Sequence, residues 1–423
     1  MHKTAYAGRT KSLAFFALSL LVVQVTLSLL LPASARAASL NLPALVARAA
    51  VLMDAETGAV LAAQNADEKL PIASTTKIMT ALLALERGNL DDRITISEEA
   101  AYQEGSSMYT SPGETYTLEE LLYGLLLNSG NDAAWAIAEH ISGSVPAFVE
   151  AMNQRARELG ATNTHFSNPS GLPDPGHYST ARDLALITKA ALARSDFRRI
   201  VSTKAQKVPW PVKGEEKLLV NHNRLLWRYE GADGVKTGYT TQARQCLVAS
   251  ATRDGQSLIA VVLRSEGNNV WTDAERLLDY GFANFTTRTL VRAGEKFGAV
   301  KVKGGDMESV AVQAARGLTV TVPKEKSDEL EKSVEITGEL TAPVAAGHEV
   351  GEVIFTLAGE EIGRVPLVAA ADVARPVRHR WWFWPLLVGV VYTLGYSLVR
   401  WDIRRRRQRV RWKRLMARYR DQE

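Results

Sequence analysis

An uncharged apolar stretch near the C-terminus, Trp381–Val399, restricts how this 423-residue chain can be arranged. Its length is close to the roughly 20 residues that a helix needs to cross a bilayer. Three tryptophans stand in its first four residues, as in the aromatic belt at a membrane interface. Residues 400–423 then carry eleven Lys or Arg and three acidic residues. Because basic flanks stay on the cytoplasmic side, the pattern predicts a transmembrane helix over 381–399 and a basic cytoplasmic tail over 400–423 that can also touch anionic lipid. The charge asymmetry argues against the alternative, a buried core helix with a solvated tail.

Residues 1–37 are predicted to be a secretory signal peptide. Met1–Lys11 is short and basic, Leu13–Leu31 is mostly apolar, and small residues follow Pro32. Cleavage is expected near position 37 or 38. The apolar run is almost long enough to span a membrane, so an uncleaved anchor helix is the alternative. In both cases residues from 40 onward lie outside the cytoplasm.

Composition excludes several classes of protein. Hydrophobic residues make up 46% of the chain and charged residues 23%, so a core can be buried and a disordered or collagen-like chain is excluded. The one cysteine, Cys246, cannot form an internal disulfide or a cysteine zinc site. No HExxH spacing occurs, and nothing in the sequence requires a metal or another cofactor. The net charge of +5 is concentrated at the two ends, so nucleic-acid binding is not expected.

Residues 40–286 have the pattern of an α+β domain. Strand candidates stand at both ends, as a hairpin between Ala47 and Ala63 and as three runs between Gly234 and Arg264. Segments with helical periodicity are Thr76–Glu86, Leu118–Leu127, Asp132–Ile141, Ala147–Leu159, Ala181–Ala193 and Ala274–Phe285. This order predicts that the first and last strands share one antiparallel sheet.

From about Leu290 the pattern changes to short β runs separated by Gly and Pro. They are Ala299–Val302, Val310–Gln313, Leu318–Val322, Val334–Glu339, Glu352–Leu357 and Arg364–Ala369. We expect a small all-β sandwich over 290–370, with a spacer or docking role, and a linker over 371–380.

Ser74 and Lys77 form the only SxxK motif in the chain, at the start of a predicted helix. A serine hydroxyl needs a base to become a nucleophile, and a lysine three residues on lies on the same helical face. The helix N-terminus favours the oxyanion that forms after attack. A lysine acts as a base only if its pKa is lowered, which burial and a second cation such as Lys236 would do. Taken alone, the motif equally fits a helix cap followed by a surface lysine.

Two further short motifs follow in the chain. Ser129-Gly130-Asn131 ends an apolar helix with a turn that can present a hydroxyl and an amide to a cleft. Lys236-Thr237-Gly238, followed by Tyr239, lies in an edge-strand-like run where a peptide can bind by strand addition, and the glycine would let a substrate backbone approach. Each alone also fits ordinary turn chemistry. The three together, in this order, are a much more specific signal.

With these motifs the chain resembles the serine-type D-alanyl-D-alanine carboxypeptidases, the low-molecular-mass penicillin-binding proteins. The resemblance extends to the segments around the motifs, 71–77, 128–134 and 233–238, and to 164–169 and 178–183. It implies a β-lactamase/transpeptidase-like catalytic domain over 40–286, a C-terminal β domain over 290–370 and a C-terminal membrane anchor.

The resemblance also implies roles for the motif residues. Ser74 would be acylated by a peptidoglycan stem peptide, with Lys77 as its base and Ser129 passing a proton to the leaving group. The substrate-binding residues would be Asn131, Lys236, Thr237, Gly238 and Tyr239, with the backbone N–H groups of Ser74 and Tyr239 as the oxyanion hole. Penicillin would acylate the same serine.

Two departures from the family pattern leave the neutralisation of the substrate carboxylate open. Many relatives have Asn-Arg-Asn where this chain has Asn221-His222-Asn223, and a histidine is not a permanent cation at neutral pH. Some relatives also have an arginine after the strand that ends here at Arg264, whereas this chain continues Glu266-Gly267-Asn268. Arg264 is the candidate that remains.

Three other functions fit parts of the pattern. A β-lactamase shares all three motifs but needs a carboxylate for deacylation, and no ExxxN occurs at the expected place, where Glu150–Asn153 is only ExxN. A DD-endopeptidase is not excluded by any motif. A non-catalytic β-lactam receptor would carry a larger membrane module.

Overall fold

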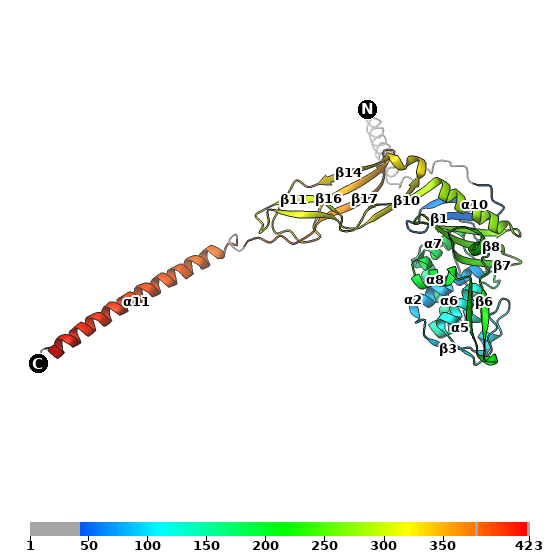
Figure 1. The fold of residues 1–423 in the computed structure, drawn as a ribbon, viewed down its shortest axis with the longest axis horizontal. Helices are drawn as coiled ribbons and strands as arrows, with labels where there is room; N and C mark the ends of the chain where they lie inside the picture. Colours follow the sequence, from blue (N-terminus) through cyan, green and yellow to red (C-terminus); the bar gives the residue numbers. More distant parts are fainter. Residues whose placement is uncertain (1–42, 377–379, 421–423) are drawn as a thin grey trace, which may run out of the picture. The chain divides into compact units, whose positions relative to one another are not determined.

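The computed structural model describes residues 43–376 and 380–420. The predicted signal peptide, residues 1–37, lies outside the described residues. The chain has a mixed α+β part, a part built of β strands and a C-terminal helix (Figure 1).

A five-stranded antiparallel sheet organises the first part, in the order β2-β1-β9-β8-β7. Its strands are β1 (Ala49–Asp54), β2 (Val60–Gln64), β7 (Ala232–Thr240), β8 (Arg244–Arg253) and β9 (Gln256–Ser265). β1 pairs with both β2 and β9, which confirms the expected sheet shared by the two ends of this segment. β7, which carries the Lys-Thr-Gly motif, is an edge strand as expected.

The sheet is covered on both faces, and the side-chain alternation along β1 shows why. Ala49, Val51 and Met53 belong to the core shared with the helices, while Ala50 and Leu52 belong to a second core under α10 (Asn269–Asn284). Period-2 alternation thus places apolar side chains on each face of one strand. Figure 1 shows the resulting layers, with α10 on one side of the sheet and the helical layer on the other.

The helical layer lies between β2 and β7 in the sequence. Its elements are η1 (Ala73–Thr76), α2 (Lys77–Arg87), β3 (Arg93–Thr95), α3 (Glu98–Ala101), β4 (Thr115–Thr117), α4 (Leu118–Leu127), α5 (Asn131–Ser142), α6 (Val145–Glu158), α7 (Ala181–Leu192), α8 (Ser195–Ser202), β5 (Ala205–Trp210), η2 (Pro211–Lys213), β6 (Glu215–Val220) and α9 (Leu225–Arg228). Local signals fix several helix starts: Thr117 and Glu120 form a capping box on α4, and Thr180 caps α7. The six predicted helices are present, whereas α8 and the β5–β6 hairpin were not predicted.

The C-terminal domain consists mainly of β strands, which confirms the expected fold class. The strands are β10 (Phe285–Val291), β11 (Lys296–Lys303), β12 (Ser309–Ala314), β13 (Leu318–Pro323), β14 (Leu330–Ile336), β15 (Glu339–Thr341), β16 (Glu349–Leu357) and β17 (Glu360–Ala369), with the short η3 (Lys324–Glu329). Six of them form one sheet, β14-β16-β17-β12-β11-β15, and β10 pairs with β13. The predicted run Val334–Glu339 is wrong as a single strand, because it ends β14 and begins β15.

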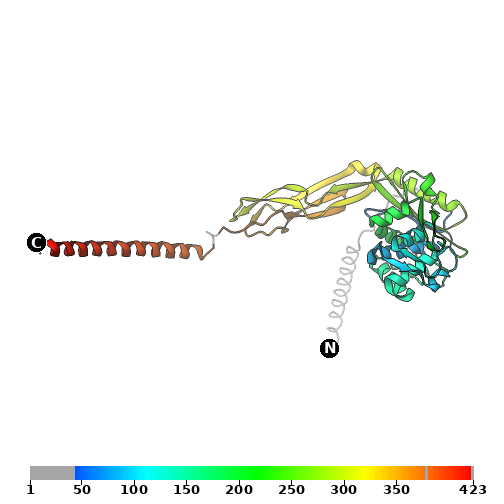
Figure 2. The ribbon, with the colours of Figure 1, turned by 60° about the horizontal axis from the view of Figure 1, so that its bottom comes forward.

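α11 (Phe383–Arg420) is one continuous helix (Figure 2). It is the one helix in the described residues that is long and apolar enough to cross a membrane, over Phe383–Met416. The predicted span, 381–399, therefore covers its first part, and the helix continues into the basic segment.

Candidate active site

Ser74 and Lys77 meet at the junction between η1 and α2. Ser74 lies in the 3₁₀ turn Ala73–Thr76, and Lys77 is the first residue of α2. The Lys77 Nζ lies 3.0 Å from the Ser74 Oγ, so the two side chains share one face as the spacing predicted. Ser74 thus sits in the turn that precedes the helix.

Two carbonyl oxygens complete the surroundings of the Lys77 amine. Its Nζ donates to the Asn131 Oδ1 at 2.7 Å and to the backbone oxygen of Ser170 at 2.7 Å. The side chain is fully buried. Burial, reinforced by the nearby charge of Lys236, holds the Lys77 pKa well below its ordinary value, and the carboxylate of Asp132 opposes this only in part. The predicted depression of the pKa therefore has both of its expected causes.

The Ser129-Gly130-Asn131 turn joins α4 to α5. Ser129 has a left-handed backbone, with φ of 61°, and its side chain is buried. Asn131 begins α5; its backbone N–H donates to the Ser106 oxygen at 2.7 Å and its side-chain amide donates to the Glu104 oxygen. The turn therefore links the Lys77 amine to the loop that follows α3.

The Lys-Thr-Gly motif brings β7 against the turn that carries Ser74. Lys236 is buried, which lowers its pKa to about 7, and its Nζ donates to the Thr237 oxygen at 3.0 Å. A Cβ on Gly238 would stand 3.0 Å from the Ile72 oxygen, 3.0 Å from the Ser74 nitrogen and 3.1 Å from the Thr75 nitrogen. The backbone that approaches this glycine is therefore that of the Ser74 turn, a contact that the sequence did not predict.

A pocket of about 320 Å³ opens over these motifs. Its lining residues are Ser74, Ser106, Ser129, His222, Arg224, Thr237, Gly238, Tyr239, Gln245, Gly267, Asn268 and Trp271. Five predicted site residues are among them. The other three, Lys77, Asn131 and Lys236, are buried side chains that do not line it. Arg264, the remaining candidate for the carboxylate, does not line the pocket either.

Asp132 organises the loop on one side of the pocket. It is completely buried; its Oδ1 accepts from the N–H groups of Met108 and Ala133, and its Oδ2 from the Ser107 Oγ and from the N–H and Oγ of Thr110. From the other side the Lys217 Nζ donates to the Met108 oxygen at 2.8 Å. Sequence reasoning missed this role, although the position of Asp132 directly after the Ser-Gly-Asn motif could have indicated it.

His177 contacts the turn that carries Ser74 through Thr76. Its Nδ1 accepts from the Ser167 N–H at 3.1 Å, which places the ring proton on Nε2, 2.8 Å from the Thr76 Oγ1. The Thr76 hydroxyl donates to the Ala73 oxygen at 2.8 Å. Ala73 itself has φ of 47°, so side-chain hydrogen bonds hold a left-handed residue directly before Ser74. Burial lowers the His177 pKa to about 4.

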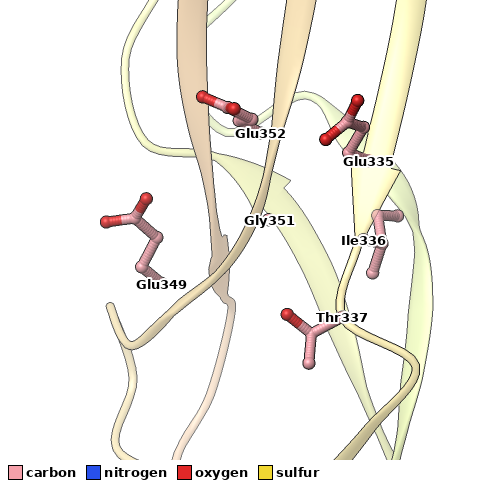
Figure 3. A pocket seen from close by; sticks show the side chains of 6 residues that line it. All are labelled: Glu335, Ile336, Thr337, Glu349, Gly351 and Glu352. Atoms are coloured by element: carbon pink, nitrogen blue, oxygen red, sulfur yellow. The ribbon is translucent and has the colours of Figure 1, made fainter.

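A larger hollow, about 530 Å³, lies in the β domain (Figure 3). Glu335, Glu349 and Glu352 line it with Ile336, Thr337 and Gly351. No serine, lysine or histidine lines it, so it lacks the groups that the first pocket brings together. Within residues 43–376 and 380–420 no group of His, Cys, Asp or Glu side chains is arranged to hold a metal.

Comparisons with known proteins agree on one family. A family model described as D-alanyl-D-alanine carboxypeptidase matches residues 35–267, and one described as penicillin-binding protein 5, C-terminal domain, matches residues 285–375. D-alanyl-D-alanine carboxypeptidase DacF of Bacillus subtilis is 37% identical over 343 residues, which cover 78% of this chain and 86% of that protein.

Solved structures give the same result. Penicillin-binding protein 5 of Haemophilus influenzae superposes with a TM-score of 0.69 at 36% identity, covering 78% of this chain and 98% of that one. A mutant DD-transpeptidase of Streptomyces has a TM-score of 0.55 at 37% identity and covers 57% of this chain and 99% of its own. Both similarities lie well above the level at which a fold alone is shared.

Proposed function

The chain belongs to the D-alanyl-D-alanine carboxypeptidase family of serine peptidases, and on this premise we propose that Ser74 is the nucleophile that removes the terminal D-alanine from peptidoglycan stem peptides. The observation that carries the proposal is the 3.0 Å contact between the Ser74 Oγ and a buried lysine amine whose pKa is lowered. A serine becomes nucleophilic when a neighbouring base takes its proton.

The neighbours of Lys77 support its role as that base. A neutral amine has two N–H groups and one lone pair. The Asn131 Oδ1 and the Ser170 carbonyl oxygen can only accept hydrogen bonds, so they take the two N–H groups. The lone pair then faces the Ser74 hydroxyl and can take its proton.

Acylation follows from this arrangement. The Ser74 Oγ bonds to the carbonyl carbon of the penultimate D-alanine as its proton moves to Lys77. The oxyanion would accept hydrogen bonds from the backbone N–H groups of Ser74 and Tyr239, two residues that line the same pocket. The bond to the terminal D-alanine nitrogen then breaks as the Ser129 hydroxyl gives its proton to that nitrogen. The proton that Lys77 carries replaces it on Ser129, so Lys77 is neutral again. D-Alanine leaves and an ester on Ser74 remains.

Deacylation returns the enzyme to its initial state. Water gives a proton to the neutral Lys77 amine and attacks the ester carbonyl, and the Ser74 oxygen leaves with the proton that Lys77 returns. β-Lactams, whose strained amide presents the same carbonyl and carboxylate, would acylate Ser74 by the first half of this sequence. Asn131, Lys236 and Thr237 would hold the substrate amide and carboxylate. Gly238 would allow β7 to pack closely against the turn that carries Ser74.

We also propose the location that the terminal segments predict. Residues 1–37 would be a signal peptide, residues 381–399 a single membrane-spanning helix, and residues 400–423 a cytoplasmic tail. The catalytic domain, residues 40–286, and the β domain, residues 290–370, would then stand outside the cytoplasm on the linker 371–380. The apolar start of α11 and its arginine-rich end support this orientation.

The test is the release of free D-alanine from a stem pentapeptide that ends in D-Ala-D-Ala, with the full-length protein in detergent. We expect release by the wild type and none by Ser74→Ala. A wild type that releases no D-alanine contradicts the carboxypeptidase proposal. Cleavage of crosslinked stem-peptide dimers, transfer to an acceptor amine or rapid penicillin turnover would then identify an endopeptidase, a transpeptidase or a β-lactamase.

A further inference from the structure

The pocket over Ser74 has one strongly basic side chain in its lining. Arg224 lies directly before α9 and faces the pocket together with Trp271 of α10. Its guanidinium carbon is 6.0 Å from the centre of the Trp271 ring, a distance at which a cation and an aromatic face attract each other. None of the ion pairs between described residues involves Arg224. An arginine without a carboxylate partner, held at the edge of a pocket, is available for an anionic ligand.

The neighbouring arginine differs in each of these respects. Arg228, one helical turn further on, also lies 5.9 Å from the Trp271 ring. Its Nε, however, pairs with a carboxylate oxygen of Glu275 at 2.9 Å, and it does not line the pocket. The two arginines thus share an aromatic neighbour but not a partner, which makes Arg228 a matched control for Arg224.

The other basic groups near the pocket are poor permanent cations. Burial lowers the pKa of Lys77 and of Lys236, and neither side chain lines the pocket. His222 lines it, but burial and the charge of Lys236 lower its pKa, so its ring is neutral at pH 7. The lining contains no aspartate or glutamate. An anion that enters therefore meets one permanent positive charge, at Arg224.

We propose that Arg224 binds the C-terminal α-carboxylate of the substrate and thereby makes the enzyme select free chain ends. The inference rests on the proposed carboxypeptidase function, in which the bond that breaks lies one residue from that carboxylate. Ser74 and Arg224 both line this pocket, and its volume of about 320 Å³ has room for one terminal residue. Two parallel N–H groups of an arginine match the two oxygens of a carboxylate, and Trp271 orients the guanidinium plane. Arg224 thus supplies the positive charge for the carboxylate two positions after His222, the residue that replaces the arginine of many relatives.

The experiment compares two peptides that differ only at the terminal group. One is diacetyl-L-Lys-D-Ala-D-Ala with a free carboxylate, and the other is its C-terminal amide. Release of D-alanine or of D-alaninamide is measured by mass spectrometry for full-length wild type, Arg224→Gln, Arg224→Lys and Arg228→Gln. We expect Arg224→Gln to lower kcat/KM on the carboxylate peptide by about 10- to 100-fold, because a hydrogen-bonded charge is lost, and to change the amide peptide less than about twofold.

The two further variants control for charge and for folding. Arg224→Lys keeps the charge without the planar fork and should recover part of the loss, and Arg228→Gln should stay within about twofold of the wild type on both peptides. Acylation by a penicillin derivative without a carboxylate checks that Arg224→Gln retains a working Ser74.

The outcomes separate this inference from the proposed function. No D-alanine release by the wild type removes the proposed function itself. An active wild type with an unchanged Arg224→Gln, or with an equal loss on both peptides, overturns the inference. An equal loss in Arg228→Gln also overturns it, because the effect would then come from the packing around Trp271. If Arg224→Gln does not fold, an Arg224→Lys variant with a reduced preference for the carboxylate peptide supports the inference, and one with the wild-type preference overturns it.

Discussion

Substituting Asp132 by asparagine tests whether one buried carboxylate holds the loop beside the active site. Its two oxygens accept five hydrogen bonds, from Ser107, Met108, Thr110 and Ala133. An asparagine can keep only one acceptor. If its carbonyl takes the Oδ1 position, the bonds to Met108 and Ala133 survive, and the hydroxyls can rotate, but the Thr110 N–H then faces an amide N–H. If it takes the Oδ2 position, two backbone N–H groups lose their acceptor.

The less costly orientation sets the expected magnitude. One buried unsatisfied N–H costs about 1–3 kcal/mol, and the loss of charge from the remaining bonds adds about 1 kcal/mol, so we expect a loss of about 2–4 kcal/mol. For a domain of this size that lowers Tm by about 5–15 °C. Because Asn131 donates to Ser106 in the same loop, and Ser106 lines the pocket, acylation by a fluorescent penicillin should slow at least about tenfold.

The assay is differential scanning fluorimetry with stopped-flow acylation on the same preparations. Asp91→Asn, at an exposed position, is the control and should match the wild type. An Asp132→Asn protein whose Tm lies within 1 °C of the wild-type value, with a normal acylation rate, would refute the reasoning, since no buried donor would then have lost its acceptor.

Three further expectations follow from the same geometry. Gly238→Ala places a methyl group 3.0 Å from the Ile72 oxygen and the Ser74 nitrogen, so stopped-flow acylation should fall about 10- to 100-fold, whereas Gly338→Ala, with open space around its Cβ, should not change it. His177 is neutral in the folded protein down to about pH 4, while an unfolded histidine gains a proton below about pH 6.5, so the unfolded state binds more protons in this window. In urea titrations the advantage of the wild type over His177→Gln should therefore shrink by about 3 kcal/mol between pH 7 and pH 4; a constant difference would show that His177 is not buried neutral. The acylation rate should rise with pH as Lys77 loses its proton and fall as the Lys236 charge is lost near pH 7. Lys236→Met should therefore abolish the fall in rate at high pH. A fall that remains in this variant would assign it to another group.

Much of the fold was predictable because the local signals agree with the tertiary structure. Thr117 and Glu120 form a capping box, and α4 begins and ends where the periodicity placed it. β1 pairs with β9, which lies more than 200 residues further along the chain, and a short apolar run predicted each of the two strands. The β5–β6 hairpin escaped prediction because its exposed residues, such as Leu218 and Val220, do not alternate cleanly with polar ones.

The residues of the site also divide into those that short motifs predict and those that only the tertiary structure brings together. Ser74, Lys77, Ser129, Asn131 and Lys236 come from short motifs with a chemical reason for their spacing. Their supporting groups depend on contacts between distant segments, which no spacing encodes: the Ser170 oxygen on Lys77, and His177 on Thr76. Arg224 escaped prediction for a different reason. The family pattern places the cation at position 222, where this chain has a histidine. That Arg224 lines the pocket depends on the tertiary structure.

Locating the covalent adduct that benzylpenicillin forms would show directly whether Ser74 is the nucleophile. Full-length protein is incubated with the antibiotic, quenched in acid and digested with trypsin, which releases the peptide Leu70–Lys77. We expect this peptide to gain the mass of the intact antibiotic, fragmentation to place the adduct on Ser74, and Ser74→Ala to carry none. An adduct on Thr75, Thr76 or another peptide, or an unmodified wild type, would contradict this expectation.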